Sequence, residues 1–157
     1  MVRLAGKSSR RARLADSACR AVRRLPDNIR VEYRGAIANA KVSRILRQYD
    51  LFFLPTRGEN FGHVIVEALL AGCPVLISDQ TPWRRVEQEG AGWTVPLEQP
   101  ERFLAILQQC ADMDQDSISA LSERVLALGE SILAADDVIS ANYSLFQVAA
   151  EPQRIAS

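Results

Sequence analysis

Two glutamates, Glu59 and Glu67, enclose the segment of this sequence that says most about chemistry. One apolar run, Leu51–Pro55, precedes them, and a second, residues 71–78, follows. This order predicts strand, loop, helix and strand, with the loop opening directly onto the helix N-terminus. Backbone N–H groups unpaired at such an end attract anions, above all phosphate. A phosphate site between two carboxylates that can hold hydroxyls points to a sugar nucleotide.

The pattern of apolar residues predicts alternating strands and helices around this segment. Two of the strands are almost continuously apolar, as parallel strands buried on both faces are. Ligands of such sheets bind beyond the carboxyl ends of the strands, where Glu59 lies. The predicted strands are residues 2–5, 29–33, 51–54, 75–78 and 93–95. The predicted helices are residues 11–25, a one-sided helix carrying Val42, Ile45, Leu46 and Tyr49, residues 62–71, a short helix after Pro82, a helix from Pro100, one over 118–132 and one over about 137–150.

Length and composition indicate one soluble domain, since the 157 residues are 48% hydrophobic and 24% charged. The cysteines Cys19, Cys73 and Cys110 are widely spaced and outside any metal-ligand pattern, which predicts free thiols in a reducing cytosol. No apolar run approaches the roughly 18 residues that span a bilayer. We therefore expect a cytoplasmic protein.

The formal net charge of zero hides an asymmetry. Residues 1–50 hold 13 basic and 4 acidic side chains, and the rest of the chain holds 6 and 15. One interpretation is that early helices have basic solvated faces and later ones acidic faces. Another is a positive surface that meets anionic lipid or an acidic partner domain. The arginine clusters lack interleaved aromatic residues, so nucleic-acid binding is not expected.

The residues of this region together resemble a known family. Tyr49–Thr56, followed by Glu59–Gly62, Glu67–Leu69 and Ala71–Val75, is similar to the C-terminal donor-binding domain of glycosyltransferase family 4. Those enzymes are retaining transferases of the GT-B fold, marked by two glutamates with seven residues between them. The resemblance is close over about residues 29–97. It implies an α/β fold, a Rossmann-like parallel sheet flanked by helices.

The resemblance also implies roles for individual residues. Glu67, about 7 Å along the helix axis from Gly62, would accept hydrogen bonds from both ribose hydroxyls. Glu59 would be the catalytic residue, close to the donor sugar and to the positive charge that develops at its anomeric carbon. The remaining donor-binding candidates are Asn60, Phe61 and Gly62 through their backbone N–H groups, His63 as a phosphate contact, Thr56 on the loop, and Gly35 and Ile37 bordering the base.

Simpler interpretations stay open for each of these residues. Glu67 could be a buried polar residue that other protein groups satisfy, and Glu59 could stabilise the helix N-terminus electrostatically. His63 could cap or pack at the helix start, and Arg57 is a weaker phosphate candidate. The tryptophans are expected to pack rather than to stack on a ligand, although the segment Thr81–Trp83 follows its strand closely enough to border the cleft.

The resemblance is incomplete at the N-terminus. Residues 1–157 would form a single, N-terminally truncated donor-binding domain without the acceptor-binding domain. The family's first strand and its basic, diphosphate-neutralising loop are missing, and residues 2–5 resemble the strand that follows. Because the missing strand is central, we predict that strands slide together, that another copy donates a strand, or that residues 1–10 rearrange.

Two functions from different classes follow. The first is transfer of a hexose from a nucleoside diphosphate sugar with retention, without a metal, in which this chain binds the donor and depends on an acceptor domain or a second copy. The second is a non-catalytic interaction module whose basic N-terminal surface meets lipid headgroups at the inner face of the membrane or a partner domain. A sugar-nucleotide epimerase fits less well, because such enzymes lack glutamates at this spacing.

Overall fold

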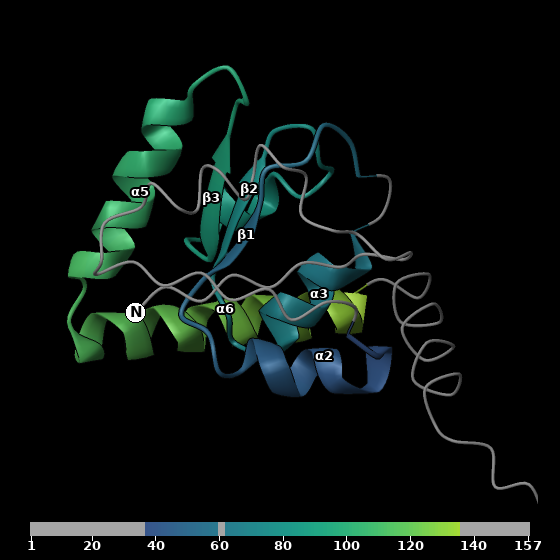
Figure 1. Ribbon diagram of the computed structural model, residues 1–157. Coiled ribbons are helices and arrows are strands. Elements are labelled where there is room, and N and C mark those ends of the chain that lie inside the picture. The colour runs from purple at the N-terminus through teal and green to yellow at the C-terminus, as the bar shows by residue number, and fades with distance from the viewer. Residues whose placement is uncertain (1–36, 60–61, 136–157) are drawn as a thin grey trace, which may run out of the picture. The chain divides into compact units, whose positions relative to one another are not determined.

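The structure is a computed structural model that describes residues 37–59 and 62–135 (Figure 1). The chain divides into two compact units, Met1–Ala38 and Asn39–Ser157. Nearly all described residues belong to the second unit. Its elements, in chain order, are α2 (Asn39–Leu46), β1 (Phe52–Leu54), α3 (His63–Leu70), β2 (Val75–Ser78), α4 (Arg85–Gln88), β3 (Gly92–Val95), α5 (Pro100–Asp112) and α6 (Gln115–Ala135).

The described strands form one parallel sheet in the order β1-β2-β3. Phe52 pairs with Val75, and Val75 pairs with Gly92, so the three strands start at the same edge. All four residues of the central strand β2 are buried, whereas those of β1 are half-buried. Apolar side chains on both faces of β2 require a layer of helices on each side, which confirms the predicted parallel sheet flanked by helices.

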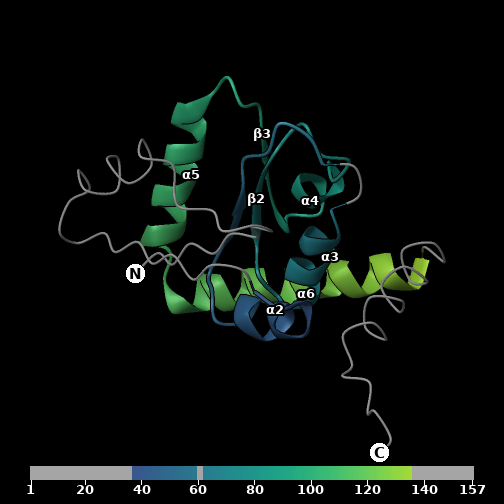
Figure 2. The same cartoon turned by 45° about the vertical axis from the view of Figure 1, so that its right-hand side comes forward.

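Helix α5 covers one face of the sheet, and α3 and α4 lie on the other (Figures 1 and 2). On the α5 face, Leu76 and Val95 pack against Phe103 and Ile106 of the helix. Phe53 of β1 meets Phe103 edge to face, with ring centroids 5.7 Å apart and planes at 66°. This geometry is favourable for two aromatic quadrupoles and fixes α5 along the sheet.

Helix α3 is held at its far end by α6. Gly129 of α6 lies so close to α3 that a Cβ there would be 2.9 Å from the Leu69 carbonyl carbon. Gly72 ends α3 with φ 68°, while Cys73 N–H donates to Ala68 O and Gly72 N–H donates to Leu69 O, the two hydrogen bonds of a Schellman motif. The Ser122 hydroxyl then donates to Gly72 O at 2.6 Å. These contacts leave the other end of α3 to face the carboxyl ends of the strands.

Most predicted elements in the described part are confirmed, with shifted boundaries. β1 begins at Phe52 rather than residue 51, and β3 begins at Gly92 rather than residue 93. The prediction of one helix carrying Tyr49 was wrong, because α2 ends at Leu46, residues 47–48 form a turn, and Tyr49 lies after that turn. Cys73 and Cys110 are free thiols, as predicted. In the described ranges, no helix combines the length and the hydropathy that a membrane span requires.

Several predictions fall on residues outside the described part. They are the strands over residues 2–5 and 29–33, the helices over 11–25 and 137–150, and Cys19. The prediction of a missing central strand, closed by one of three routes, and the prediction of a single truncated domain also stay predictions.

Candidate functional site

The loops that follow β1 and β2 meet at the carboxyl edge of the sheet, beside the start of α3. The first loop contains Thr56 and Glu59, and the second contains Thr81 and Trp83. One hydrogen bond joins the first loop to the end of β2: the fully buried hydroxyl of Ser78, the last residue of that strand, donates to Thr56 O at 2.5 Å. This is the edge at which parallel α/β sheets bind ligands.

Gly62 forms the entry to α3 in a left-handed conformation, with φ 69° and ψ 42°. Its carbonyl accepts the first helical hydrogen bonds, from Ile65 N–H at 2.7 Å and Val66 N–H at 3.2 Å. A Cβ at this position would lie 2.6 Å from Nε1 of Trp83. Glycine is therefore required here twice, for its positive φ and for the space that Trp83 fills.

The carboxylate of Glu59 lies directly on this turn, because its Oε1 atom accepts a hydrogen bond of 3.0 Å from Gly62 N–H. A carboxylate at a helix N-terminus is favourable, since it faces the positive end of the helix dipole. The described structure thus shows Glu59 in the capping role that was left open from the sequence. The catalytic role of Glu59 stays a prediction.

His63 and Glu67 lie four residues apart and share one face of α3. Both are half-buried, whereas Ile65, Val66, Ala68 and Leu69 are buried in the core. Solvent does not reach the Nε2 atom of His63 or the Oε2 atom of Glu67. Glu67 thus lies at the boundary of the core, with one of its carboxylate oxygens shielded from solvent.

Thr56 uses its hydroxyl within its own loop. The hydroxyl donates to Gly58 O at 2.8 Å and accepts from Gly58 N–H at 3.2 Å. These bonds shape the turn that leads to Glu59. Direct donor binding by Thr56 stays a prediction, and a contribution through the loop conformation is what the contacts support.

The other candidates are placed as follows. Arg57 is exposed on the loop after β1, and Ile37 is half-buried in the first compact unit. Gly35, Asn60 and Phe61 lie outside the described residues. Trp83 is the residue that sequence reasoning undervalued. The packing expected of it is confirmed, since it is 8% exposed, but it packs on the very glycine that opens the predicted phosphate site.

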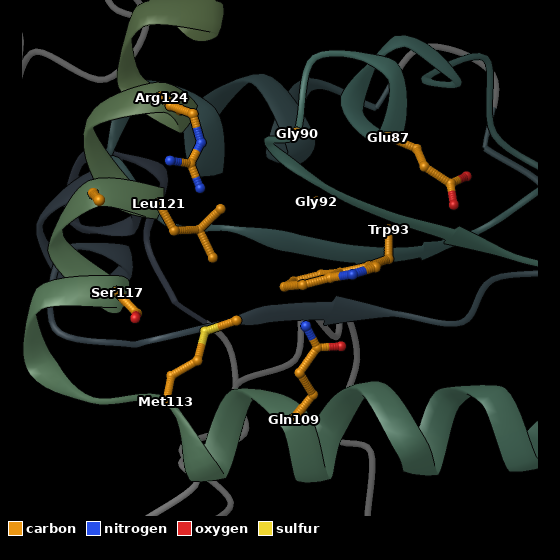
Figure 3. Close-up of a pocket in the computed structure, with 10 residues that line it drawn as sticks. Glu87, Gly90, Gly92, Trp93, Gln109, Met113, Ser117, Leu121 and Arg124 are labelled. Carbon is orange, nitrogen blue, oxygen red and sulfur yellow. The ribbon is translucent and has the colours of Figure 1, made fainter.

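A separate pocket of about 520 Å³ lies at the opposite, amino edge of the sheet (Figure 3). Trp93 extends into it from β3, with Gln109 of α5 on one side and Arg124 and Leu121 of α6 on the other. It contains none of the predicted site residues. The two tryptophans of the chain therefore mark opposite edges of the sheet.

The chain belongs to the group 1 glycosyl transferases, since residues 1–113 match the profile of that family. It is similar to phosphatidyl-myo-inositol mannosyltransferase of Mycobacterium tuberculosis, with 34% identity over 105 residues, which is 64% of this chain and 27% of the relative. The protein of the same name from Mycolicibacterium smegmatis is 33% identical over 110 residues, 67% of this chain and 28% of the relative. The matched part thus spans only about a quarter of these relatives.

Proposed function

We propose that this chain is the donor-binding part of a retaining glycosyltransferase that takes a hexose from a nucleoside diphosphate sugar. The main support for this proposal is the start of α3, where Gly62 in a left-handed conformation places a helix N-terminus between Glu59 and Glu67. The hydrogen bond from Ser78 to Thr56 and the contact of Trp83 with Gly62 support the shape of this turn. The mannosyltransferase names of the relatives support a hexose as the transferred sugar.

In this proposal the anionic diphosphate lies at the N-terminus of α3. Gly62 N–H, with Asn60 and Phe61, donates hydrogen bonds to phosphate oxygens, and His63 lies in the first turn beside them. Glu67 accepts hydrogen bonds from the ribose hydroxyls, and Gly35 and Ile37 border the base. Helix ends and basic side chains stabilise the leaving diphosphate without a metal. Glu59 stabilises the positive charge at the anomeric carbon, and the sugar is transferred with retention.

Transfer needs more protein than residues 1–157 in this proposal. An acceptor-binding domain, or a second copy of the chain, supplies the acceptor on the same face as the donor. The isolated chain therefore binds nucleotide weakly and turns over nothing. The working site is in the cytoplasm, and contact with the inner face of the membrane brings the acceptor within reach.

Calorimetric titration of the chain with UDP, GDP and ADP tests donor binding. We expect saturable binding of at least one of them, and loss of about tenfold or more in affinity on Glu67→Gln, because a hydrogen bond to a charged group is worth about 1.5–3 kcal/mol. The matched control is Glu130→Gln on α6, which should bind like the wild type.

The 2′-deoxy form of the best-binding nucleotide assigns the loss to the ribose. If Glu67 holds the hydroxyls, the Glu67→Gln effect shrinks on the deoxy ligand. An equal effect on both ligands would contradict the ribose role, and absence of binding by any of the three nucleotides would contradict donor binding itself.

The alternative, an interaction module that keeps the fold without catalysis, is favoured by one observation on α2 and the turn after it. Lys41, Arg44 and Arg47 are all exposed. Within the described ranges none of the three forms an ion pair. Co-sedimentation with phosphatidylglycerol vesicles, compared with phosphatidylcholine vesicles, tests this candidate. Binding to the anionic vesicles that Lys41→Glu with Arg44→Glu abolishes would support it.

A further inference from the structure

The indole of Trp83 lies against the backbone of Gly62. The position of a Cβ on Gly62 is 2.6 Å from Trp83 Nε1 and 3.1 Å from Trp83 Cδ1, so the edge of the ring covers the glycine Cα. Ile65 closes the same space from within the helix, with its Cδ1 atom 3.0 Å from that position. The left-handed turn is therefore confined between an aromatic edge and the first turn of α3.

Trp83 is itself held by hydrogen bonds that lead back to the strands. The backbone N–H of Trp83 donates to Thr81 Oγ1 at 3.4 Å, and the Thr81 hydroxyl donates to Ser78 O at 3.3 Å. The Ser78 hydroxyl in turn donates to Thr56 O. Trp83 O accepts the Val86 N–H bond at 3.3 Å, which ties the other side of Trp83 to α4.

These contacts connect the loop after β2 to the carboxylate of Glu59. Because Glu59 Oε1 is hydrogen-bonded to Gly62 N–H, the orientation of the Gly62 peptide sets the position of this carboxylate. A side chain that fixes Gly62 thereby fixes the amide that the diphosphate would meet and, before the donor binds, the carboxylate hydrogen-bonded to that amide. None of this requires Trp83 to touch the ligand.

We propose that Trp83 is a positioning residue for the sugar-nucleotide donor: through its contact with Gly62 it holds the turn that presents the Gly62 amide and the Glu59 carboxylate. The inference rests on the proposed function, and it adds a residue from the loop after β2 to the donor site. Misplacement by about 1 Å can cost about 100-fold in rate where reacting groups must be aligned. The hydrogen bonds of an anion site are also directional, so loss of this support has a measurable effect on binding.

The two tryptophans give the experiment an internal contrast, because the chain has no others. In a Trp93→Phe protein all indole emission comes from Trp83, and in a Trp83→Phe protein all of it comes from Trp93 at the amino edge. Each is titrated with the nucleoside diphosphate that binds best in calorimetry. We expect a saturable change in Trp83 emission with the calorimetric Kd, and no change in Trp93 emission.

Affinity measured by calorimetry separates positioning from general stability. We expect Trp83→Leu to weaken nucleotide binding about tenfold, Trp83→Phe to recover part of the loss, and Trp93→Phe to bind like the wild type. Val86→Ala is the matched control: Val86 is fully buried beside Trp83 in α4, so this variant loses stability but should keep its affinity.

The outcomes distinguish the two levels of the proposal. Nucleotide binding that is unaffected by Trp83→Leu and silent in Trp83 emission would overturn the positioning role and leave donor binding standing. Equal loss of affinity in Trp83→Leu and Val86→Ala would reduce Trp83 to a general structural role and overturn it as well. Absence of nucleotide binding in every protein would overturn the proposed function and this inference together.

Discussion

The Glu59 carboxylate and the Gly62 amide are hydrogen-bonded to each other at 3.0 Å. The Glu59 carboxylate therefore already accepts a hydrogen bond from the Gly62 N–H group, which the proposed phosphate would also need. Both are anions that prefer the N-terminus of a helix, so they compete for it. Donor binding requires the carboxylate to leave Gly62, and the released carboxylate is then free to approach the sugar.

Because of this competition, we expect Glu59→Ala to lower the stability of the protein but to raise its affinity for nucleoside diphosphates. Without ligand, we expect the free energy of unfolding to fall by about 1 kcal/mol, because a charged cap of α3 is lost. With UDP, GDP or ADP, which lack the transferred hexose, we expect affinity to rise severalfold because the competing anion is gone. Thermal unfolding and calorimetry on the same preparations test both.

The exposed Glu98, in the turn after β3, gives the matched control, since Glu98→Ala removes the same charge away from α3. It should change neither quantity appreciably. Weaker nucleotide binding in Glu59→Ala would contradict the competition and would indicate that Glu59 helps to hold the diphosphate itself.

Replacement of Gly62 by alanine should be costly both to stability and to nucleotide binding. The methyl group enters a position with φ 69° and lies 2.6 Å from the Trp83 ring, so the turn must shift. We expect a loss of about 2 kcal/mol or more in the free energy of unfolding and a clear loss of nucleotide affinity. Chemical denaturation and calorimetry measure the two effects.

Gly58, four residues earlier in the same loop, is the matched control. A Cβ there meets nothing within 4 Å, and its φ is not in the left-handed range. Gly58→Ala should therefore be tolerated within about 0.5 kcal/mol. If both alanine variants behaved alike, the contact between Gly62 and Trp83 would not be what fixes the turn.

Strands β1 and β2 of the sheet could be predicted from sequence because each is marked by a short run of consecutive apolar residues. The run Val75–Ser78 is apolar at nearly every position, and it forms a strand with those bounds in which all four residues are buried. Pro100 opens α5 as expected, since its fixed φ and missing N–H suit a first helical turn. The end of α2 was missed, because a helical spacing that reaches Tyr49 does not show that the chain turns after Leu46.

The contacts inside the candidate site could not be predicted in the same way. Glycine at position 62 indicates a special backbone, but its partner Trp83 is 21 residues away and comes from another loop. The bond from Ser78 to Thr56 likewise joins residues that only the parallel pairing of β1 and β2 brings together. Local pattern selects the residue types, and the pairing of strands decides which of them meet.

The Ser78 hydroxyl should stabilise the edge of the sheet measurably. It is fully buried and donates to Thr56 O, so Ser78→Ala leaves a carbonyl without that donor. We expect a loss of about 1–2 kcal/mol in the free energy of unfolding. Ser119→Ala, on an exposed part of α6, should stay within about 0.5 kcal/mol. Equal stability of the two variants in denaturant titrations would argue against a role for this bond.

Burial of Cys73 should make the stability of the protein depend on alkaline pH. Burial of the thiol, with a smaller contribution from the negative charge of Asp50, raises the pKa of Cys73 from 9.0 to about 12. The folded state therefore keeps the proton over a range in which the unfolded state releases it. The resulting stability is fully present below about pH 9 and is lost as the pH rises towards 12, by up to about 1.4 kcal/mol per pH unit.

Comparison with Cys73→Ala isolates this term from the other groups that titrate in alkali. At pH 8 we expect the wild type to be more stable than the variant, because the thiol fills its site in the core. Between pH 9 and pH 10 the difference should shrink or change sign, as measured by denaturant titration at each pH. The half-buried Cys110 serves as the control. Burial also raises the pKa of its thiol, but Cys110 is less buried than Cys73. The stability of Cys110→Ala should therefore change with pH more nearly as that of the wild type does. A constant difference in unfolding free energy between wild type and Cys73→Ala from pH 8 to pH 10 would contradict this prediction. It would mean that the Cys73 thiolate forms without unfolding. The packing around the thiol, which contacts Tyr49 O and Pro74 O, would then open to water more easily than these contacts indicate.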